Sequence, residues 1–306
     1  MNTTEFPHSI GLKGVANARE LGGYKTIDGR EVVSGVLLRT GKLSQATAED
    51  LKKLTNEYKV AAVIDLRSAE EINGSPEVAV FTGTADPDPD PQLDGVRRLN
   101  LPVLDMQRLI KPISAVRESS DLSALEAVAK ADVLGDTLYY TFVDDEPGRG
   151  SYSRLFRELL ALEEGRALLV HCSQGKDRTG VAAMLILTAL GVSEQTVLDD
   201  YLLTNTYNSE RIAAKRAELE RAGLLSADNV AAMLSATDSV NISYMTSLIA
   251  HINERCGSVM GYITGELGIT ADEIAKLREK FLIPPPAASQ APPSGSDWGL
   301  SGYQRS

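Results

Sequence analysis

The stretch that most constrains this chain is "LLVHCSQGKDRTGVAAM", residues 168–184. A buried hydrophobic run ends at Cys172, and a helix is predicted to begin near Arg178, so only a short loop separates strand from helix. The backbone N–H groups of such a loop can converge on one point at the helix N-terminus, where unpaired N–H groups and the helix dipole favour an anion. The sequence therefore predicts an anion-binding loop directly after a buried strand.

The residue types in this loop suit chemistry on a phosphate group. The field that attracts an anion also favours the thiolate form of a cysteine, and Arg178 offers a rigid fork that can bind two phosphate oxygens at once. Thr179 can donate its hydroxyl to the thiolate, and later to the sulfur when it leaves. A thiolate beneath a cradled phosphate is arranged for in-line attack, so we expect Cys172 to be the nucleophile and Arg178 the phosphate clamp.

The other loop residues are expected to bind the substrate or to shape the loop. Gly175 allows close backbone approach, and Gly180 is expected to let the helix pack tightly against the strand. Lys176 adds positive charge at the mouth of the loop, which would suit substrates with more than one phosphate. His171 is expected to orient the loop from behind rather than to transfer protons. The predicted substrate-binding residues are Ser173, Gln174, Gly175, Lys176 and Arg178.

Residues 171–180 fit the pattern HCxxGxxR[ST]G, for which a chance match in a chain of this length is on the order of 10⁻⁵. "HCSQGKDRTG" resembles the phosphate loop of cysteine-based protein tyrosine phosphatases, in the form with Lys-Asp before the arginine. "NARELGGY", "VIDLRS", "DDYLLTN" and "GYITGELGITADEIAKL" resemble the bacterial tyrosine/lipid phosphatase family, which has mycobacterial members. The resemblance covers about residues 14–283, and it implies a phosphocysteine intermediate, no metal and no cofactor.

The general acid is open between two aspartates, because the chain lacks the Trp-Pro-Asp loop of eukaryotic tyrosine phosphatases. Asp177 can reach the rim of the loop, although the adjacent Lys176 and Arg178 stabilise its charged form. Asp65 ends a predicted strand, where active-site groups of open α/β sheets collect, but it could equally pair with Arg67 or cap a turn. We favour Asp177.

Two residues near the N-terminus are further candidates. The resemblance suggests that Asn17 and Arg19 brace the site through hydrogen bonds, and a purely structural role in a turn remains the alternative.

His8 and His251 lack partners at metal-ligand spacing, so no metal is expected. The acidic run at residues 86–90 is interpreted as a solvated linker rather than a calcium loop, because it lacks the glycine and terminal glutamate of such a loop.

The order of predicted elements indicates an α/β fold with a mainly parallel central sheet flanked by helices, as in protein tyrosine phosphatases. We expect short strands within 17–40, strands at 59–68, 96–103 and 166–172, a helix over 46–58 with Thr47 as its N-cap, and a helix over 178–190. Residues 105–165 should be mostly helical with a break at 144–150, and the chain after residue 190 almost wholly helical to Leu282. This gives one phosphatase domain over 1–283, with about 205–260 as a helical lid, and a Pro/Ser/Gly-rich tail over 284–306.

Composition limits the partners. The net charge of −11 argues against a general nucleic-acid binder, and the longest apolar run is too short for stable membrane insertion. Two cysteines and no recognisable signal peptide favour a cytoplasmic setting, with leaderless secretion left open. Oligomeric state and the role of the tail are not predictable.

The predicted function is a phosphatase that acts on phosphotyrosine, and also on phosphoserine/threonine and phosphoinositides. One alternative is a catalytically silent phosphate-binding module, which the intact Cys172 argues against because a binder needs no thiol. Another alternative is a phosphatase dedicated to soluble inositol phosphates.

Overall fold

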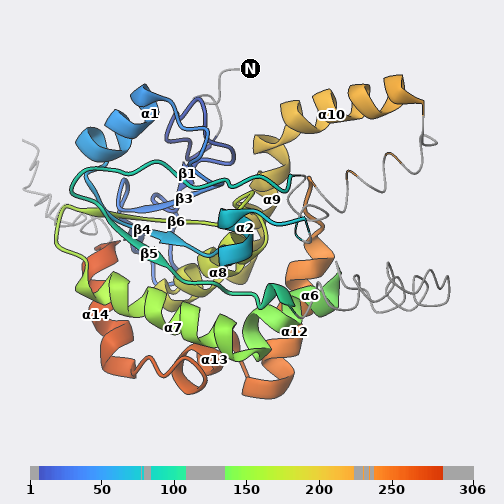
Figure 1. Ribbon diagram of the computed structural model, residues 1–306. Coiled ribbons are helices and arrows are strands. Elements are labelled where there is room, and N and C mark those ends of the chain that lie inside the picture. The colour runs from blue at the N-terminus through green and yellow to red at the C-terminus, as the bar shows by residue number, and fades with distance from the viewer. Residues whose placement is uncertain are drawn as a thin grey trace, which may run out of the picture.

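The computed structural model describes residues 7–76, 78, 84–107, 135–223, 230, 234 and 238–284. Its centre is a five-stranded sheet in the order β1-β3-β6-β4-β5 (Figure 1). β3, β6, β4 and β5 run parallel, and β1 runs antiparallel to β3. The predicted α/β fold with a mainly parallel sheet is confirmed. The strands are β1 (Arg19–Glu20), β3 (Leu37–Thr40), β6 (Ala167–His171), β4 (Val60–Asp65) and β5 (Arg97–Asn100).

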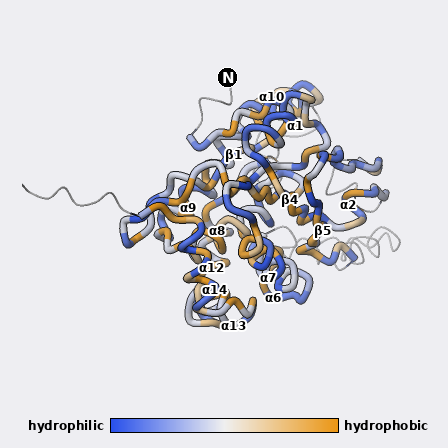
Figure 2. Tube along the Cα trace, turned by 90° about the vertical axis from the view of Figure 1, so that its left-hand side faces the viewer, coloured by the Kyte–Doolittle hydropathy of each residue, from blue (hydrophilic) through white to orange (hydrophobic). Residues whose placement is uncertain are grey.

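Helices cover both faces of this sheet, because every central strand is apolar on both sides. Alternate residues enter two separate hydrophobic clusters: Leu168 and Val170 face one, and Leu169 faces the other. The larger cluster lies against α6 (Asp136–Asp144), α7 (Glu146–Ala161), α8 (Arg178–Leu190), α9 (Glu194–Tyr207), α12 (Ile242–Cys256), α13 (Val259–Gly265) and α14 (Ala271–Phe281). The smaller lies beneath α1 (Ala48–Lys52) and the π-helical turn η2 (Lys53–Glu57) that continues it. Figure 2 shows hydrophobic residues along β4 in the interior.

The strand register aligns the carboxyl ends of β3, β4 and β6 at one edge of the sheet. Thr40 of β3 and Asp65 of β4 both pair with His171, the last residue of β6. The segments that follow these strands therefore meet at the carboxyl edge of the sheet, where open α/β sheets bind their ligands. Cys172, which directly follows β6, lies at the centre of that edge.

The local structure confirms some of the sequence-based predictions and differs from others. Thr47 caps α1 in a capping box with Asp50, as predicted. The expected break over 144–150 is narrower than predicted: only Asp145 separates α6 from α7, because Pro147 occupies the first turn of α7, where its missing N–H is not needed. The described chain after residue 190 is mostly helical to Phe281, close to the predicted end at Leu282. There β7 (Leu282–Ile283) begins and pairs with β2 (Glu31–Val32) in a small second sheet.

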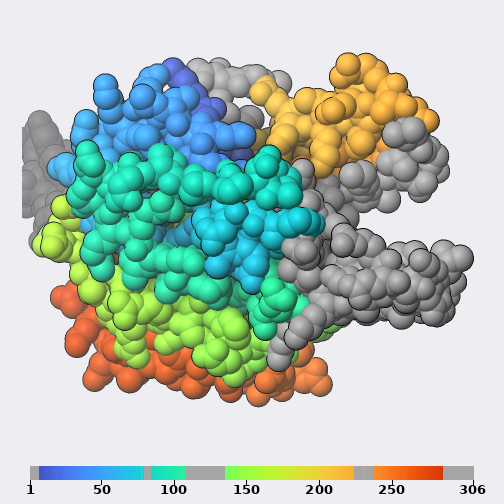
Figure 3. Space-filling view, in the orientation of Figure 1, coloured from blue at the N-terminus to red at the C-terminus, as the bar shows by residue number. Residues whose placement is uncertain are grey.

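The region predicted as a lid is described in part. α10 (Ser209–Ala222) has no buried residue and projects from the body of the molecule (Figure 3). Residues 224–229, 231–233 and 235–237 of that region lie outside the described residues, as do 108–134 and the tail from 285 onward. No helix in the described part of the chain is long and apolar enough to cross a membrane.

A buried ionic cluster joins the sheet to α9. Arg19 of β1 and Arg39 of β3 both bind the carboxylate of Asp200, and both guanidinium groups are fully buried. Tyr24 donates a third hydrogen bond to the same carboxylate. Burial alone would raise the pKa of Asp200, but Arg19 and Arg39 outweigh it and lower the pKa to about 2. The charged carboxylate is thus the counter-ion that lets two arginines be buried.

Replacing Asp200 by asparagine should lower stability strongly. Asp200→Asn leaves two buried guanidinium groups without a counter-charge, which costs about 3–5 kcal/mol for a broken buried pair. Urea unfolding followed by circular dichroism should show a lower midpoint. Asp199→Asn, an exposed neighbour on the same helix, is the matched control and should unfold close to the parent. Equal midpoints for the two variants would contradict this account of the cluster.

The effect should also depend on pH. Because the folded-state pKa is lowered, the stabilisation is present above about pH 4, the ordinary range of an aspartate, and is lost as pH falls toward 2. The stability difference between parent and Asp200→Asn should therefore shrink over that window.

Candidate active site

The loop between β6 and α8 turns its carbonyl groups outward. The Ser173 carbonyl accepts from the backbone N–H of Lys42, and the Gln174 carbonyl accepts from Asn17 at 3.4 Å. The Gly175 carbonyl accepts from both Asn17 and Arg39 at 2.8 Å. A loop whose carbonyls point away from its centre presents its N–H groups toward it.

Most N–H groups of the same loop have no partner among the residues that the structure describes. Within the described ranges, the backbone N–H groups of Ser173, Gln174, Gly175, Asp177 and Arg178 donate no hydrogen bond. Ser173, Gln174, Asp177 and Arg178 are partly exposed, so water or a ligand can reach these donors. Their position before the N-terminus of α8 is compatible with the anion cradle that the sequence predicts, which stays a prediction.

Gly175 has the backbone conformation that this loop requires. Its φ is +69°, and a Cβ there would lie 2.3 Å from the carbonyl oxygen of Thr40 in β3. The predicted close backbone approach is confirmed, and no other residue fits without moving β3.

Asn17 and Arg19 lie directly behind the loop. Asn17 also has positive φ (56°), and besides holding the Gln174 and Gly175 carbonyls it accepts a short hydrogen bond from Arg19 through its Oδ1. Arg19 is fixed in turn by Asp200. The ionic cluster of Arg19, Arg39 and Asp200 thus sets the position of the loop from below.

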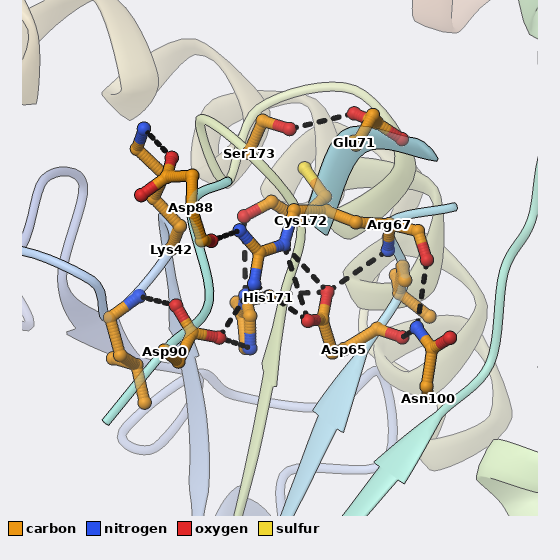
Figure 4. Close-up of polar contacts among 12 residues, drawn as sticks. Lys42, Asp65, Arg67, Glu71, Asp88, Asp90, Asn100, His171, Cys172 and Ser173 are labelled. Carbon is orange, nitrogen blue, oxygen red and sulfur yellow. Dashed lines mark hydrogen bonds and ion pairs between the residues drawn. The ribbon is translucent and has the colours of Figure 1, made fainter. Parts of the chain in front are cut away.

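Cys172 precedes the loop and Thr179 lies in the first turn of α8, and both are buried. Figure 4 shows the Cys172 side chain beyond the end of β6, on the side where Ser173 hydrogen-bonds Glu71. The Thr179 hydroxyl has no hydrogen-bond partner among the residues that the structure describes. A buried hydroxyl without a partner costs stability, so this hydroxyl is a candidate donor to a bound group.

Glu71 holds the predicted phosphate clamp. Its two carboxylate oxygens accept from the two terminal nitrogens of Arg178 at 2.6 and 2.8 Å, and Ser173 donates to the same carboxylate at 2.8 Å. Burial would raise the pKa of Glu71, but the Arg178 charge and the hydrogen bonds from Arg178, Ser68 and Ser173 together outweigh it, so the pKa is lowered. Glu71 also closes the capping box of α2 (Ala69–Asn73) by accepting from the Ser68 N–H. The start of α2 is therefore tied to the clamp.

The geometry of this pair leaves the other edge of the guanidinium unused. Glu71 takes one hydrogen from each terminal nitrogen of Arg178, and Nε makes no hydrogen bond within the described ranges. The remaining N–H groups of Nε and one terminal nitrogen lie on the same side and form a second fork. Arg178 can therefore keep Glu71 while it binds two phosphate oxygens.

Asp65 lies deep in the site and is fully engaged. Arg67 binds its carboxylate through both Nε and a terminal nitrogen, and the Arg67 backbone N–H donates as well (Figure 4). Burial would raise its pKa, but His171 and Arg67 outweigh burial and the pKa is lowered. The structure thus shows the pair with Arg67 that was the alternative to an acid role.

The acidic run 86–90 is solvated only in part: Asp86, Pro87 and Pro89 are exposed, as predicted. Asp90 is buried, accepts from Arg67 and from the Leu43 N–H, and lies 3.2 Å from Nε2 of His171, at an angle that makes no hydrogen bond. Asp88 forms an ion pair with Lys42. The prediction fails at Asp90, because the local sequence cannot show that a buried arginine binds this carboxylate.

Asp65, Asp90 and His171 form a group with metal-ligating atoms. A terminal nitrogen of Arg67 lies 2.8 Å from both carboxylates. The guanidinium therefore supplies the positive charge that a cation would bring, and the group is explained as a support of the sheet edge behind Cys172. His171 is buried within it, at the back of the loop, as expected.

Asp177 occupies the N-cap position of α8 without capping it. Its side chain accepts no hydrogen bond from the first turn of the helix, although aspartate at this position usually does. Instead Oδ1 accepts from the hydroxyl of Tyr139 at 2.5 Å. The carboxylate is partly exposed and lies at the edge of the loop, in contrast to Asp65.

Lys176 and Gln174 point toward the predicted lid region. Lys176 is only 6% exposed and donates to the Ser239 carbonyl at 3.1 Å, while its ammonium lies 3.9 Å from Asp177. Gln174 accepts from Arg211 of α10. The cation predicted at the mouth is thus partly covered by the segment before α12.

Gly180 serves a different contact from the one predicted. A Cβ there would lie 3.1 Å from the ring of Tyr201 on α9 and 3.7 Å from Met245 on α12. The tight packing is between helices, not between helix and strand. The sequence could not show this, because it does not say which face of α8 meets the sheet.

Sequence reasoning missed several residues of the site: Arg39, Glu71, Asp90, Tyr139 and Asp200. Glu71 carried a signal, since Ser68 and Glu71 form a capping-box pattern directly after a strand that ends at the sheet edge. Asp200 lies in the "DDYLLTN" stretch that carries the family resemblance. Arg39, Asp90 and Tyr139 had no local signal.

Comparison with known proteins agrees with this geometry. The tyrosine phosphatase family model matches residues 10–283. A protein of Cupriavidus necator named as a tyrosine-protein phosphatase is 31% identical over 276 residues, which are 90% of this chain and 89% of that protein. The triple specificity protein phosphatase PtpB of Mycobacterium tuberculosis is 28% identical over 139 residues, 44% of this chain and 50% of that protein. A tyrosine-protein phosphatase of Nostoc commune is 24% identical over 176 residues, 58% of this chain and 50% of that protein. The chain, whose loop between β6 and α8 lies at the centre of the sheet edge, belongs to the tyrosine phosphatase family.

Proposed function

We propose that this protein hydrolyses phosphate monoesters through a phosphocysteine intermediate on Cys172. The observation that carries the proposal is the run of loop N–H groups without a hydrogen-bond partner among the described residues, at Ser173, Gln174, Gly175, Asp177 and Arg178, between Cys172 and the start of α8. Such a cradle stabilises the equatorial oxygens of a phosphoryl group in transfer.

The reaction proceeds in two displacements. The Cys172 thiolate attacks phosphorus, the S–P bond forms, and the P–O bond to the leaving group breaks while Arg178 binds two of the remaining oxygens. Water then attacks the phosphocysteine, which releases inorganic phosphate and restores the thiolate. The unpartnered Thr179 hydroxyl would donate to the sulfur when it carries negative charge. Glu71 keeps Arg178 in place throughout.

The leaving oxygen needs a proton, and we propose that Asp177 supplies it. Its carboxyl group lies at the edge of the loop and is partly exposed, whereas Asp65 is buried and bound by Arg67 on both oxygens. Arg67 stabilises the charged form of Asp65 and lowers its pKa, which opposes a role as proton donor. Asp177 also fits the second step, in which it takes the proton of the attacking water.

The substrate range is proposed to include phosphotyrosine, phosphoserine/threonine and phosphoinositides. A relative is named a triple specificity protein phosphatase. The site has cations beyond Arg178, namely Lys176 and Lys42, although each is engaged, by Ser239 and Asp88 respectively. A substrate with a second phosphate would replace those partners.

The helical region from about 205 to 260 is proposed to shield the site. Arg211 of α10 reaches Gln174, and Ser239 reaches Lys176, so this region contacts the phosphate loop at two places. A cover of this kind would limit access of oxidants to the thiolate.

Substitution of the nucleophile should abolish turnover and spare binding. Cys172→Ser should lose on the order of 10⁴–10⁶-fold in kcat, because a serine hydroxyl is too basic to ionise there, while phosphate binding by calorimetry is retained. Arg178→Lys should be severely impaired in both, because an ammonium cannot reproduce the fork. Cys256→Ser, the matched control on α12, should retain turnover of an aryl phosphate. Undiminished turnover by Cys172→Ser would end the proposal, and an inactive parent that binds phosphate would favour the silent module.

The general acid can be identified by leaving-group dependence. Asp177→Asn should slow phenyl phosphate roughly 10²–10⁴-fold more than p-nitrophenyl phosphate, because only the poor leaving group needs the proton. Asp65→Asn should lower stability and slow both esters alike, since it disturbs the pair with Arg67. Selective loss in Asp65→Asn with equal loss in Asp177→Asn would reverse the assignment.

The substrate classes can be separated at Lys176. Lys176→Ala should reduce kcat/KM for a phosphoinositide more than for a phosphotyrosine peptide, because only the former has a second phosphate to bind. Phosphate release from both, measured side by side with soluble inositol phosphates, gives the ratio. Lys52→Ala, an exposed lysine on α1, is the control and should leave the ratio unchanged. Equal losses on both substrates would mean that Lys176 only stabilises the loop.

A further inference from the structure

Two buried tyrosines form a chain of hydroxyl groups that ends on Asp177. The Tyr139 hydroxyl of α6 lies 2.5 Å from Oδ1 of Asp177, and the Tyr201 hydroxyl of α9 lies 2.7 Å from the Tyr139 hydroxyl. Each tyrosine is only 1% exposed. The ring of Tyr201 packs against α8 at Gly180, which has no side chain. The two hydroxyl groups are therefore held beside the helix that Asp177 precedes.

The direction of the chain follows from the number of protons. Tyr139 has one hydroxyl hydrogen and gives it to the carboxylate, so Tyr201 must donate to the oxygen of Tyr139. Burial, together with the charge of Asp177, raises the pKa of both tyrosines well above its ordinary value, so both stay protonated donors near neutral pH. Hydrogen bonds in such a chain strengthen one another.

The two hydroxyl groups favour Oδ2 as the oxygen of Asp177 that carries the proton, because Oδ1 already accepts from Tyr139. Oδ2 has no hydrogen-bond partner among the residues that the structure describes. The groups that face Oδ2 with charge are Lys176, 3.9 Å away, and the adjacent Arg178. The first-turn N–H groups of α8, which usually donate to an N-cap side chain, donate no hydrogen bond to the Asp177 carboxylate.

We infer that Tyr139 is the positioning residue of the general acid and that Tyr201 supports it. The inference rests on the proposed role of Asp177 and adds how the fold orients that group. Tyr139 holds the carboxyl away from the helix amides and leaves Oδ2 to face the leaving group.

The proton balance of the step is simple. As the S–P bond to Cys172 forms and the P–O bond breaks, the proton moves from Oδ2 of Asp177 to the leaving oxygen, which departs as an alcohol or phenol. Tyr139 keeps its proton and stabilises the carboxylate that results. In the second displacement, Oδ2 takes the proton of the attacking water, and the acid is restored.

A structural role for the tyrosines gives a different expectation. Buried tyrosine hydroxyls need partners in any protein, and loss of one would lower stability and slow all substrates equally. A positioning role acts only on steps that need the proton, so it is visible in the ratio between poor and good leaving groups.

The test is therefore Tyr139→Phe in the full chain, assayed with phenyl phosphate and p-nitrophenyl phosphate. Tyr139→Phe should slow phenyl phosphate about 10-fold more than the nitrophenyl ester, the loss expected for one hydrogen bond to a charged group. Tyr201→Phe should show a smaller loss with the same selectivity, and it serves if Tyr139→Phe does not fold. Tyr262→Phe is the matched control: its buried hydroxyl donates to the Val143 carbonyl at 3.0 Å, and its removal should not change the ratio.

A double substitution separates the two levels of the proposal. In an Asp177→Asn background, Tyr139→Phe should cause little further selective loss, because the residue through which it acts is gone. Equal slowing of both esters by Tyr139→Phe and Tyr201→Phe, or full additivity in the double variant, would overturn the positioning role while leaving Asp177 as the acid. Absence of selective loss in Asp177→Asn alone would overturn the acid assignment, and the positioning role with it.

Discussion

The hydrogen bonds that hold the carbonyls of residues 173–175 outward are the contacts on which the site depends. If these carbonyls turned inward, the loop would present negative dipoles to an anion and repel it. Asn17, Arg39 and the backbone of Lys42 prevent this from three sides. Because a glycine with positive φ is needed at 175 to follow this path along β3, the loop sequence and its supports depend on each other.

Buried arginine–carboxylate pairs then carry that geometry into the rest of the fold. Asp200 binds the arginines beneath the loop, Glu71 holds the clamp beside it, and Asp90 with Arg67 supports the edge behind it. Each pair joins segments far apart in sequence. Pairs of this kind add little net stability over apolar packing, but they are costly to break and therefore fix one arrangement. They also explain how a chain with a net charge of −11 can offer a positive site, since each acidic partner lies behind an arginine rather than in the cradle.

Neighbouring residues of α9 serve the two ends of the loop. Asp200 acts beneath Gly175 through Arg19 and Arg39, and Tyr201 acts on Asp177 through Tyr139. Both contacts require α9 to lie close to α8, which Gly180 allows. A single helix thus couples the phosphate cradle to the carboxyl group that we propose as the acid, so a shift of α9 would disturb binding and proton transfer together.

The sequence by itself determined the phosphate loop, its cysteine and arginine, and the α/β class, because those depend on local spacing: a buried strand, a short glycine-containing loop and a helix start within about fifteen residues. It also gave the Thr47 cap, which is equally local. The supports of the site were decided only by tertiary structure. Arg39, Glu71, Asp90 and Tyr139 come from separate strands, helices and loops. Their charged partners in the site, which are Asp200, Arg178, Arg67 and Asp177 respectively, lie 23 to 161 residues away in the chain. A single sequence shows no pattern at such separations, because burial of a charge or a hydroxyl is set by which segments the sheet register brings together. For the same reason the sequence did not show that Asp90 is buried, or that Arg67 binds Asp65 and Tyr139 binds Asp177.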